Sequence, residues 1–569
     1  MTTDSTGTTT TPVAEAASSS GGITAGEKAV AASQGMLHAW WAARIPDRPA
    51  LITAFGDRTF GELNANINRL VRALRARGLV RGDSVALMCT NRPEFIEVLY
   101  AAQRGGFRLT PLNWHLTGEE AAYIVANCEA KAFVCSVEVA EAAVEATSEV
   151  ASEVAEKCGG VGLVRIVIGG TGPGFEEYAS VIAAEDGSDI DDPVLGTQML
   201  YTSGTTGRPK GVHREGAAPS ALATVNFCGY DEAYETSVDT HLLTGPLYHA
   251  APLAFSVAVP ALYGVPIVVM ERWDPVETLR LIEQHGITHS HMVPTMFHRM
   301  LALADDVKER YELSSLRFVI HGAAPCPVTV KQGLIEWLGP ILVEYYAATE
   351  GLGTLVDSTT WLAHPGTVGR PMVPGLVKVM RDGDGDGDGD GGVEAAPGEI
   401  GLVFLRAVAT AKFDYYGDEE KTAGAFRGDY FTLGDMGYMD EEGYLFLTDR
   451  TANLIISGGV NIYPAEVDAV LLEHPAVGDV ATIGIPDDEW GEEVKAVVQL
   501  AEGIEPSPAL AAELIEFTRS HLAHFKCPRS VDFTPELPRE DTGKIFKRKL
   551  RDQYRAAAER DRQSPAATE

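Results

Sequence analysis

The sequence predicts an α/β protein in which a large, multilayered N-terminal domain of mixed sheets and helices is followed by a small α+β domain. A chain of 569 residues with 45% apolar content is long enough for a large core and for more than one domain. Strand-like runs alternate with longer helical segments, as in mainly parallel α/β layers. The pattern changes near residues 449–451, and about a hundred residues remain, which is enough for a small domain.

The first regular element that the sequence predicts is a helix that begins near Thr59. Thr59 and Glu62 have the spacing of a capping box, and Gly78 provides a stop. Apolar residues recur between them at helical intervals, at Leu63, Ile67, Leu70, Val71 and Leu74. Strand-like runs follow at residues 84–88, 132–135, 164–168, 199–202 and 318–320. These runs alternate with helical segments, so we expect mainly parallel strands.

Residues 242–270 carry no Asp, Glu, Lys or Arg and are long enough to cross a bilayer. However, proline and glycine interrupt the stretch repeatedly, which a membrane helix would not favour. The interrupting residues are Pro246, Pro252, Pro260, Gly264 and Pro266. We therefore expect a strand, a loop, a short helix and a second strand in the core of a soluble protein, and no membrane span.

The charge and the cysteine content of the sequence limit the expected binding partners and the expected cellular compartment. The net charge of -34, from 46 basic and 80 acidic residues, would repel nucleic acid. The cysteines are scattered without a C-x-x-C pair, which is typical of buried thiols in a reducing cytoplasm. Residues 1–27 lack the basic and apolar regions of a signal peptide, so we expect a disordered tail there. A tail is also expected at residues 556–569. A cytoplasmic protein is expected, and the sequence leaves a homodimer open.

The most distinctive loop reads YTSGTTGRPKGV at residues 201–212. Its glycines let the backbone turn sharply beside a ligand, its hydroxyls can donate to phosphate oxygens, and Lys210 adds a mobile positive charge. The spacing does not fit G-x-x-x-x-G-K-[ST], which excludes an ordinary P-loop NTPase. The loop predicts polyphosphate binding, with a polar surface loop as the alternative. The candidate residues are Thr202, Ser203, Gly204, Thr205, Thr206, Gly207 and Lys210.

Two patterns invite a metal site, and neither fits one. Residues 382–392 alternate Asp and Gly, but the last ligand position of an EF-hand loop would fall on Val393 or Ala395 instead of Glu. Among nearby histidines only His289 and His291 could share a strand face, and they have no acidic or cysteine partner close in sequence. We therefore expect a solvated hairpin insertion and no zinc site.

Three further segments follow the glycine-rich loop. They read YYAATEG at residues 345–351, YFTLGD at 430–435 and PREDTGK at 538–544. In this order the segments resemble the adenylate-forming superfamily of acyl-CoA synthetases, luciferases and peptide-synthetase adenylation domains. The resemblance implies that ATP and a carboxylic acid form an acyl-AMP with release of pyrophosphate, and that CoA then takes the acyl group. It also implies that residues 28–449 hold the ATP and acyl pockets, and that residues 450–555 form a mobile domain that rotates between half-reactions.

For the nucleotide, the resemblance assigns a role to residues in each segment. Thr349 would contact phosphate, and Glu350 would hold Mg²⁺. Asp435 would bind the ribose hydroxyls, and Arg450 would reach ribose or phosphate. Lys544 would neutralise charge on the bridging oxygens during adenylation, and with Lys210, Thr349 and Glu350 it forms the expected catalytic set. Adenine would lie against Gly322, Ala323, Ala324, Pro325 and Tyr346.

The acyl pocket is expected near the segment LYHAAP at residues 247–252, with His249 as an aromatic gate or, alternatively, as a core histidine. The other expected pocket residues are small or apolar, and they are Ala251, Ala254, Phe255 and Gly351. They provide no charged group for the ammonium of an amino acid. A fatty, aromatic or polycyclic acid is therefore favoured.

The CoA channel would be bordered by Gly458 and Gly459, where side chains would obstruct the close approach of the backbone. Two positions depart from the pattern of the superfamily. Ala347 replaces the glycine of Tyr-Gly-x-Thr-Glu, which narrows the pocket there. The hinge position, usually Asp or Lys, is Ala452, and we expect its backbone to permit rotation with different polar restraints.

The main interpretation is an ATP-dependent acid:CoA ligase for a hydrophobic acid. The alternative is a stand-alone enzyme that loads an acyl group onto a carrier protein, and trapping the group on CoA or on protein distinguishes the two. A catalytically silent nucleotide-binding scaffold comes from another class, and the presence of Lys210, Glu350, Asp435 and Lys544 argues against it. Nothing in the sequence indicates luciferase-like oxygen chemistry. The size of the acid and the pathway are not predicted.

Overall fold

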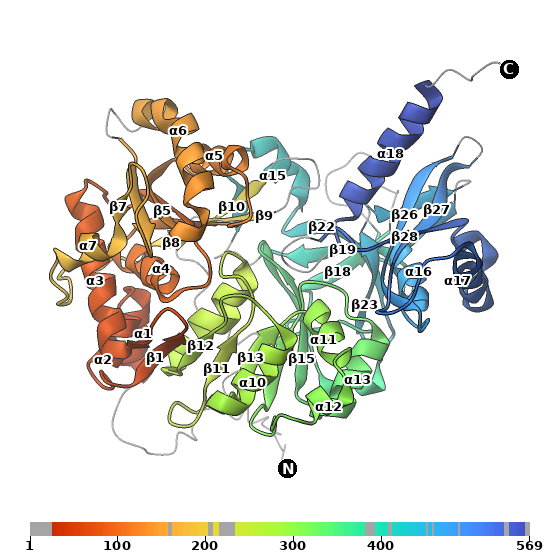
Figure 1. Cartoon of the computed structure of the whole chain (residues 1–569), viewed down its shortest axis with the longest axis horizontal. Coiled ribbons are helices and arrows are strands. Elements are labelled where there is room, and N and C mark those ends of the chain that lie inside the picture. The colour runs from red at the N-terminus through yellow and green to blue at the C-terminus, as the bar shows by residue number, and fades with distance from the viewer. Residues whose placement is uncertain are drawn as a thin grey trace, which may run out of the picture.

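The computed structural model shows a large N-terminal domain and a small C-terminal domain side by side, red to cyan and blue respectively in Figure 1. The described residues are 25–157, 162–202, 209–214, 234–381, 393–407, 412–450, 453–457, 460–487, 490–539 and 545–563. The predicted mixed α/β class, with a large and a small domain, is confirmed.

A six-stranded parallel sheet forms one lobe of the N-terminal domain. In spatial order its strands are β7 (Glu176–Glu177), β6 (Val164–Ile168), β5 (Ala130–Ser136), β3 (Ser84–Met88), β4 (Arg108–Leu112) and β8 (Thr197–Gln198). Successive side chains of a strand point to opposite faces, so Val85 and Ala86 pack into different hydrophobic clusters. The helices that cover the two faces are α3 (Phe60–Ala76), α4 (Pro93–Gly105) and α7 (Tyr178–Ala183) on one side, and α5 (Gly118–Asn127) and α6 (Ala140–Lys157) on the other.

A nine-stranded sheet forms the second lobe and positions most of the site. In spatial order its strands are β17 (Arg370–Pro371), β16 (Gly351–Asp357), β15 (Leu342–Ala348), β14 (Phe318–His321), β13 (His289–Met292), β11 (His241–Leu243), β12 (Ile267–Val269), β1 (Pro49–Thr53) and β2 (Arg58–Thr59). The run from β15 to β1 is parallel. Its outer face is covered by α10 (Pro275–His285), α11 (Pro294–Leu301), α13 (Val328–Leu338) and α14 (Ser358–Ala363). The carboxyl ends of β11 and β13 to β15 therefore meet at one edge, where open α/β sheets bind ligands.

Several local predictions are confirmed. Thr59 and Glu62 form the expected capping box, and the helix that follows is α3. Residues 84–88 form β3. The uncharged stretch folds as β11, a loop, a π-helix at Pro252–Ala258 that continues into α9 (Val259–Tyr263), and then β12. Within the described part of the chain, no helix is both long and apolar enough to cross a membrane.

Two smaller sheets complete the N-terminal domain. The first contains β20 (Phe413–Tyr415), β10 (Lys210–Arg214) and β9 (Leu200–Thr202). The second contains β18 (Val377–Met380), β19 (Gly401–Arg406), β22 (Tyr430–Met439) and β21 (Phe426–Arg427), with β23 (Leu445–Arg450) paired to β22. The helix α15 (Glu419–Ala425) connects the two sheets in sequence. The Asp-Gly repeat at 382–392 lies outside the described residues.

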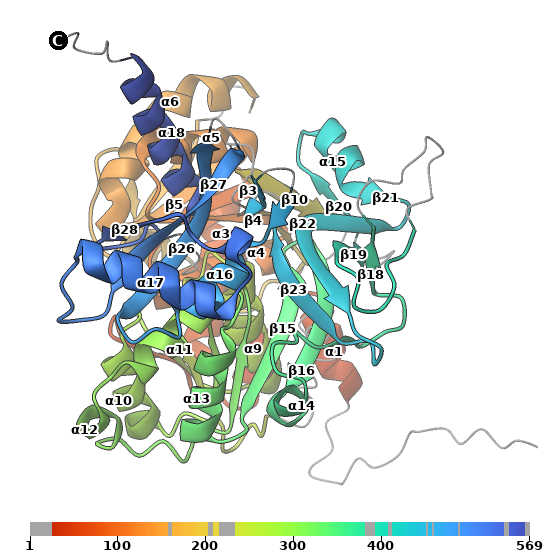
Figure 2. The same ribbon diagram turned by 90° about the vertical axis from the view of Figure 1, so that its right-hand side faces the viewer.

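The C-terminal domain is built around a long antiparallel hairpin of β26 (Val477–Asp487) and β27 (Gly491–Leu500). The remaining strands of its sheet are β24 (Ile455–Ser457), β25 (Val460–Ile462) and β28 (Ser530–Thr534). Val480 and Ala481 face opposite sides, so α16 (Pro464–Leu471) and α17 (Pro508–His521) cover one face and α18 (Lys547–Gln563) the other. Figure 2, in which this domain faces the viewer, shows α17 crossing in front of the sheet.

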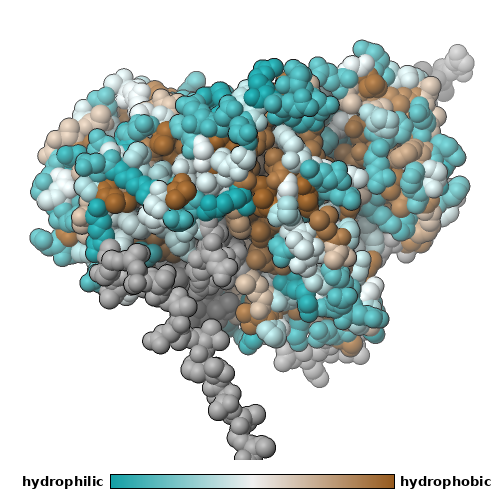
Figure 3. Space-filling view, turned by 90° about the horizontal axis from the view of Figure 1, so that it is seen from below, coloured by the Kyte–Doolittle hydropathy of each residue, from teal (hydrophilic) through white to brown (hydrophobic). Residues whose placement is uncertain are grey.

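The ends of the described chain extend slightly further than the sequence predicts. Helix α1 (Ala25–Ser33) begins before residue 28, and α18 continues beyond residue 555. The strand β23 ends at Arg450, and the next strand, β24, belongs to the sheet of the small domain. The face of the molecule in Figure 3 is largely hydrophilic, with hydrophobic residues gathered toward its middle.

Candidate active site

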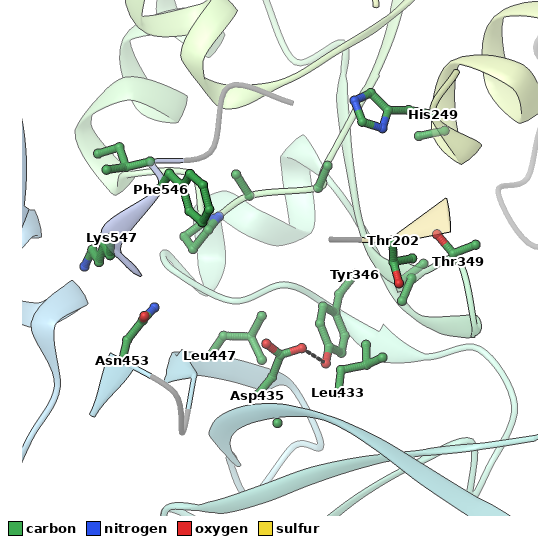
Figure 4. A pocket seen from close by; sticks show the side chains of 18 of the residues that line it. Thr202, His249, Tyr346, Thr349, Leu433, Asp435, Leu447, Asn453, Phe546 and Lys547 are labelled. Carbon is green, nitrogen blue, oxygen red and sulfur yellow. Dashed lines mark hydrogen bonds between the residues drawn. The ribbon is translucent and has the colours of Figure 1, made fainter. Parts of the chain in front are cut away.

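One large cavity, of about 3050 Å³, lies at the carboxyl edge of the nine-stranded sheet and is also lined by residues of the C-terminal domain. Segments that follow the parallel strands supply much of its wall, including His249 after β11, Thr295 at the start of α11 after β13, and Ala324 after β14. Figure 4 shows His249 at one end and Lys547 of the C-terminal domain at the other. The cavity thus joins the regions that the sequence assigns to the acid, to ATP and to the small domain.

Two β-hairpins bring the predicted phosphate-binding residues together. Thr202 and Lys210 face each other across β9 and β10, so the glycine-rich loop is the connection of this hairpin. Thr349 and Glu350 form the two-residue connection between β15 and β16, in which Ala348 pairs with Gly351. Thr202, Lys210, Thr349 and Glu350 all line the cavity, and Figure 4 shows the two threonines close together. The remaining loop candidates, Ser203, Gly204, Thr205, Thr206 and Gly207, lie outside the described residues.

Polar contacts join the two hairpins around Glu350, which is buried. Arg214 donates a hydrogen bond to the carbonyl oxygen of Thr349 at 2.6 Å. Tyr415 donates its hydroxyl hydrogen bond to Oε1 of Glu350 at 3.2 Å, and the Nζ of Lys210 lies 4.8 Å from the centre of the Tyr415 ring. Lys210 and Tyr415 therefore lie on the cavity wall with Glu350, and Arg214 holds the neighbouring Thr349.

The electrostatics of this cluster follow from burial and charge. Burial, followed by repulsion from Lys421, lowers the pKa of Lys210, whereas Glu350 opposes that shift. Burial also lowers the pKa of Arg214, again against the attraction of Glu350. Burial and the adjacent Glu350 carboxylate raise the pKa of Tyr415, so Tyr415 remains a neutral donor. An anion placed between Lys210 and Lys421 would relieve the repulsion between these two cations.

Sequence reasoning missed Arg214, Tyr415 and Lys421. Arg214 lies on the same strand as Lys210 at an even spacing, which is the signal that could have identified it. Tyr415 reaches the site because β20 pairs with β10 in a register that places it opposite Val212. Lys421 lies on α15, and it lines the cavity as Tyr415 does. No local pattern in the sequence reveals the register between β10 and β20.

Asp435, predicted to bind ribose, contacts Tyr346, predicted to bind adenine. The hydroxyl of Tyr346 donates a hydrogen bond to Oδ2 of Asp435 at 2.7 Å, drawn as a dashed line in Figure 4. Both side chains line the cavity, and Asp435 is buried on β22. Arg450 on β23 pairs in register with Asp435, which brings its backbone to this place. Tyr346 and Asp435 thus present one buried carboxylate to the cavity, and the hydroxyl of Tyr346 already orients it.

The loop after β14 is sharply turned. Ala323 has φ of +69°, in the left-handed region that side chains other than glycine rarely adopt. Ala323, Ala324 and Pro325 line the cavity. Gly322 is not among the described lining residues, and a Cβ built there would lie 2.5 Å from the carbonyl oxygen of Tyr345. Gly322 therefore permits close packing behind the loop, while its neighbours form the wall.

The predicted acyl residues separate into two groups. His249, Ala251, Ala254 and Phe255 line the cavity, on the loop after β11 and the π-helix that follows it. Gly351 is not among the described residues of the cavity wall, and a Cβ built there would lie 2.8 Å from the Phe431 ring. Gly351 thus packs closely against a core side chain, and its place in the acyl pocket stays a prediction.

The remaining predictions concern residues that are not described. Ala452, Gly458, Gly459 and Lys544 lie outside the described ranges, so the hinge, the CoA channel and the catalytic lysine stay predictions. No group of three or more metal-ligating side chains occurs in the described part of the chain. His289 and His291 are both buried on β13.

Comparison with known proteins supports the same superfamily. A family model described as "AMP-binding enzyme" matches residues 38–412, and "AMP-binding enzyme C-terminal domain" matches residues 466–544. Long-chain-fatty-acid–CoA ligase FadD13 from Mycobacterium tuberculosis is 33% identical over 88% of this chain and 93% of its own length. Feruloyl-CoA synthase from an Amycolatopsis species is 33% identical over 87% of this chain and 94% of its own length.

A solved structure shows the same fold. The anthranilate CoA ligase AuaEII, in complex with anthranoyl-AMP, superposes with a TM-score of 0.79 and 24% identity, over 93% of this chain and 98% of its own. The family models span both domains, and the motifs at residues 201–212, 345–351 and 430–435 border one cavity. The chain therefore belongs to the AMP-binding enzymes of the adenylate-forming superfamily.

Proposed function

We propose that the protein is an ATP-dependent acid:CoA ligase that converts a hydrophobic carboxylic acid into its CoA thioester through an acyl-AMP, with release of pyrophosphate. The observation that carries the proposal is the convergence of Lys210, Glu350 and Asp435 on one cavity that continues past an apolar wall. The similarity to FadD13 and to feruloyl-CoA synthase, two CoA ligases, supports the choice of CoA as the acceptor.

The residues provide what adenylation requires. A carboxylate resists attack by a thiol because it is anionic and has a poor leaving group, and transfer of AMP removes both obstacles. Lys210 lines the cavity and would supply positive charge where pyrophosphate leaves, and Arg214 adds positive charge behind Thr349, in a chain whose net charge is -34. Asp435 would accept hydrogen bonds from ribose hydroxyls, with its orientation fixed by Tyr346. Lys544 is proposed to neutralise the bridging oxygens during this first step.

The residues also fit the Mg²⁺ that the superfamily uses. Mg²⁺ is usually held by one or two carboxylates together with substrate phosphates. Glu350 is a buried carboxylate on the cavity wall, at the tip of the hairpin beside Thr349 and near Lys210. Glu350 would hold the ion against the phosphates, and the bound ion would neutralise charge as the phosphate bond breaks.

The C-terminal domain contributes positive charge to the same cavity. Its basic lining residues are Lys526, Arg539, Lys547, Arg548 and Arg551. Lys526 and Lys547 are held by Glu466 and Asp468, at 2.7 and 2.6 Å respectively. These side chains would attract the phosphates of ATP or CoA, both of which are polyanions. We propose that rotation about Ala452 then brings Gly458 and Gly459 to the CoA channel.

The decisive experiment measures acid-dependent exchange of labelled pyrophosphate into ATP with the purified full chain, Mg²⁺ and a panel of fatty, aromatic and polycyclic acids. We expect exchange with some acids in the absence of CoA, and an acyl-CoA product when CoA is added. The Glu350→Gln variant serves as the matched control for contaminating ligases. Absence of exchange with every acid would overturn the proposal.

The acceptor is tested in the same reactions. A phosphopantetheinylated carrier protein is supplied in place of CoA, and the acyl group is followed by mass spectrometry. Accumulation of acyl-CoA supports the ligase proposal. Exchange without acyl-CoA, but with an acylated carrier protein, would replace it with the carrier-loading function.

A further inference from the structure

The tandem tyrosines of β15 point to opposite sides of the strand, as the strand period requires. Tyr346 contacts Asp435 on the nucleotide side. Tyr345 contacts Phe255 and His291 instead, with ring centres 4.8 and 6.0 Å away. Because Tyr345 and Phe255 line the cavity and His291 is not among its described lining residues, the two aromatic side chains form a surface with His291 behind it.

The side chains of this surface are almost fully buried and contact one another. Tyr345 and Phe255 are each only 5% exposed and His291 2%, although the first two border the cavity. Phe255 stacks on His291 with an interplanar angle of 15°. The hydroxyl of Tyr345 lies 3.0 Å from Nε2 of His291, within hydrogen-bonding distance. We refer to Phe255, Tyr345 and His291 together as the aromatic wall.

The Tyr345 ring is packed on the sides that do not face the cavity. On one side, a Cβ built on Gly322 would lie 2.8 Å from Cζ of Tyr345, so the ring already touches the backbone there. On another side, Tyr345 packs with Phe255, Val259 and Ile320 in one hydrophobic cluster. Moving the ring would also break its contact with buried His291, and leaving a buried polar atom without a partner is costly.

We propose that the aromatic wall ends the acyl pocket, with Tyr345 as the specificity-determining residue and His291 as the positioning residue behind it. The inference rests on the proposed ligase function and names the acid more closely. The substrate is a compact acid, aromatic or short-chain, whose carbon skeleton stops at Tyr345. A long straight-chain acid would have to displace the wall.

The first test is a ladder of straight-chain acids from butanoate to hexadecanoate, with benzoate and cinnamate as flat acids. We expect kcat/KM of the native enzyme to fall at least roughly tenfold once the chain reaches the wall, since contacts in an apolar pocket discriminate by about that factor per methylene. Tyr345→Ala is expected to move this limit toward longer acids, without a change in the KM for ATP. Tyr345→Leu provides a second, better packed variant if Tyr345→Ala folds poorly.

Leu342→Ala is the matched control, because Leu342 is buried on the same strand but packs into a different core cluster. It is expected to lower the melting temperature while leaving the acid ladder unchanged. A ladder that stays the same in both Tyr345 variants would overturn the inference, as would equal use of butanoate and hexadecanoate by the native enzyme.

The role of His291 is tested through Tyr345→Phe, which keeps the ring and removes its hydroxyl. If His291 fixes the ring, this variant will accept longer acids with an increased KM for short ones and an unchanged KM for ATP. A purely structural role would lower stability and leave the ratio of long-acid to short-acid kcat/KM as it is, which would remove His291 from the inference.

Binding of acylsulfamoyl adenosines, stable analogues of acyl-AMP, separates this inference from the proposed function. Their affinities are measured by calorimetry with the native chain and with Tyr345→Ala. If the longest acyl chain that binds becomes longer in the variant, the result supports the aromatic wall even when no thioester forms. If the native enzyme forms thioesters with no limit on acyl length, the proposed ligase function stands and the aromatic wall is rejected.

Discussion

The nucleotide side and the acyl side of the cavity are built differently. On the nucleotide side, Thr202 pairs with Lys210 across two adjacent strands, and Thr349 and Glu350 connect two others, so residues close in sequence lie together. On the acyl side, Phe255, His291 and Tyr345 come from a π-helix and two strands and meet only in the fold. In the proposed function, adenylation would thus depend on residues at hairpin ends, whereas the acid would contact side chains of the core.

This difference implies that the nucleotide side needs rigid support beneath it. Lys331 on α13 is fully buried and donates a hydrogen bond to Oε2 of Glu344 at 2.6 Å. Glu344 lies on β15 and borders the cavity near the loop after β14, and burial raises its pKa against the attraction of Lys331. The Nζ of Lys331 also lies 4.7 Å from the centre of the Trp361 ring. This buried pair ties α13 to the strand that carries both tyrosines.

Breaking that pair should have the largest effect. Lys331→Met leaves the Glu344 carboxylate buried without its cation, and we expect unfolding free energy to fall by about 3–5 kcal/mol. Denaturant unfolding of the variant measures the loss. The double variant Lys331→Met with Glu344→Gln is the control and should recover most of the stability, because no uncompensated charge remains. A single variant as stable as the native chain would show that the pair does not support the site.

The second prediction concerns Glu350, the proposed metal ligand on the nucleotide side. Glu350→Gln retains shape but removes the charge that would hold Mg²⁺ against phosphate. We expect pyrophosphate exchange to fall by about 10²–10³-fold, the range for loss of one charge-stabilising group. The melting temperature should change little, since Gln can still accept the Tyr415 hydrogen bond at this position. Retention of near-native exchange would exclude Glu350 as the metal ligand.

The two tyrosines offer the sharpest comparison of the two sides. Tyr346→Phe removes the hydrogen bond to the Asp435 carboxylate, and bonds to charged groups contribute about 1.5–3 kcal/mol. The KM for ATP should therefore rise by about tenfold or more, with the preference among acids unchanged. Tyr345→Phe is the matched control one residue away, and its effects should appear with the acid instead. Equal effects of both variants on ATP would remove the division of the cavity into two sides.

The sequence predicted the nucleotide side better for a physical reason. Capping residues such as Thr59 and hairpin connections such as Thr349 to Glu350 depend on neighbours in the chain, so local patterns predict them. Tyr415 depends on the register between β10 and β20, and Tyr345 on packing across several strands, which no local pattern encodes. Gly351 directly follows Thr349 and Glu350, and its close packing against Phe431 likewise depends on the fold and not on neighbours in the chain.

The last prediction concerns the acyl side alone and uses the pH dependence of the unfolding free energy. Burial lowers the pKa of His291 to about 3, whereas an unfolded histidine titrates near 6.5. Below about pH 6.5 the unfolded chain therefore binds a proton that the folded chain excludes, so His291 costs stability as pH falls toward 3 and costs nothing above about pH 7. The expected loss is about 1.4 kcal/mol per pH unit in that window, or about 2 kcal/mol at pH 5.

His291→Gln isolates this contribution, because Gln does not titrate and can still hydrogen-bond to the hydroxyl of Tyr345. Buried histidines that do not interact with His291, such as His38, also have a lowered pKa, but they titrate equally in both proteins and cancel from the difference. Unfolding free energies at pH 7 and pH 5 should therefore show the variant gaining on the native chain as pH falls. A difference between the two proteins that is the same at both pH values would mean that His291 accepts a proton in the folded state. The aromatic wall would then lie in contact with water, and the acyl side would be as open to solvent as the hairpin tips opposite it.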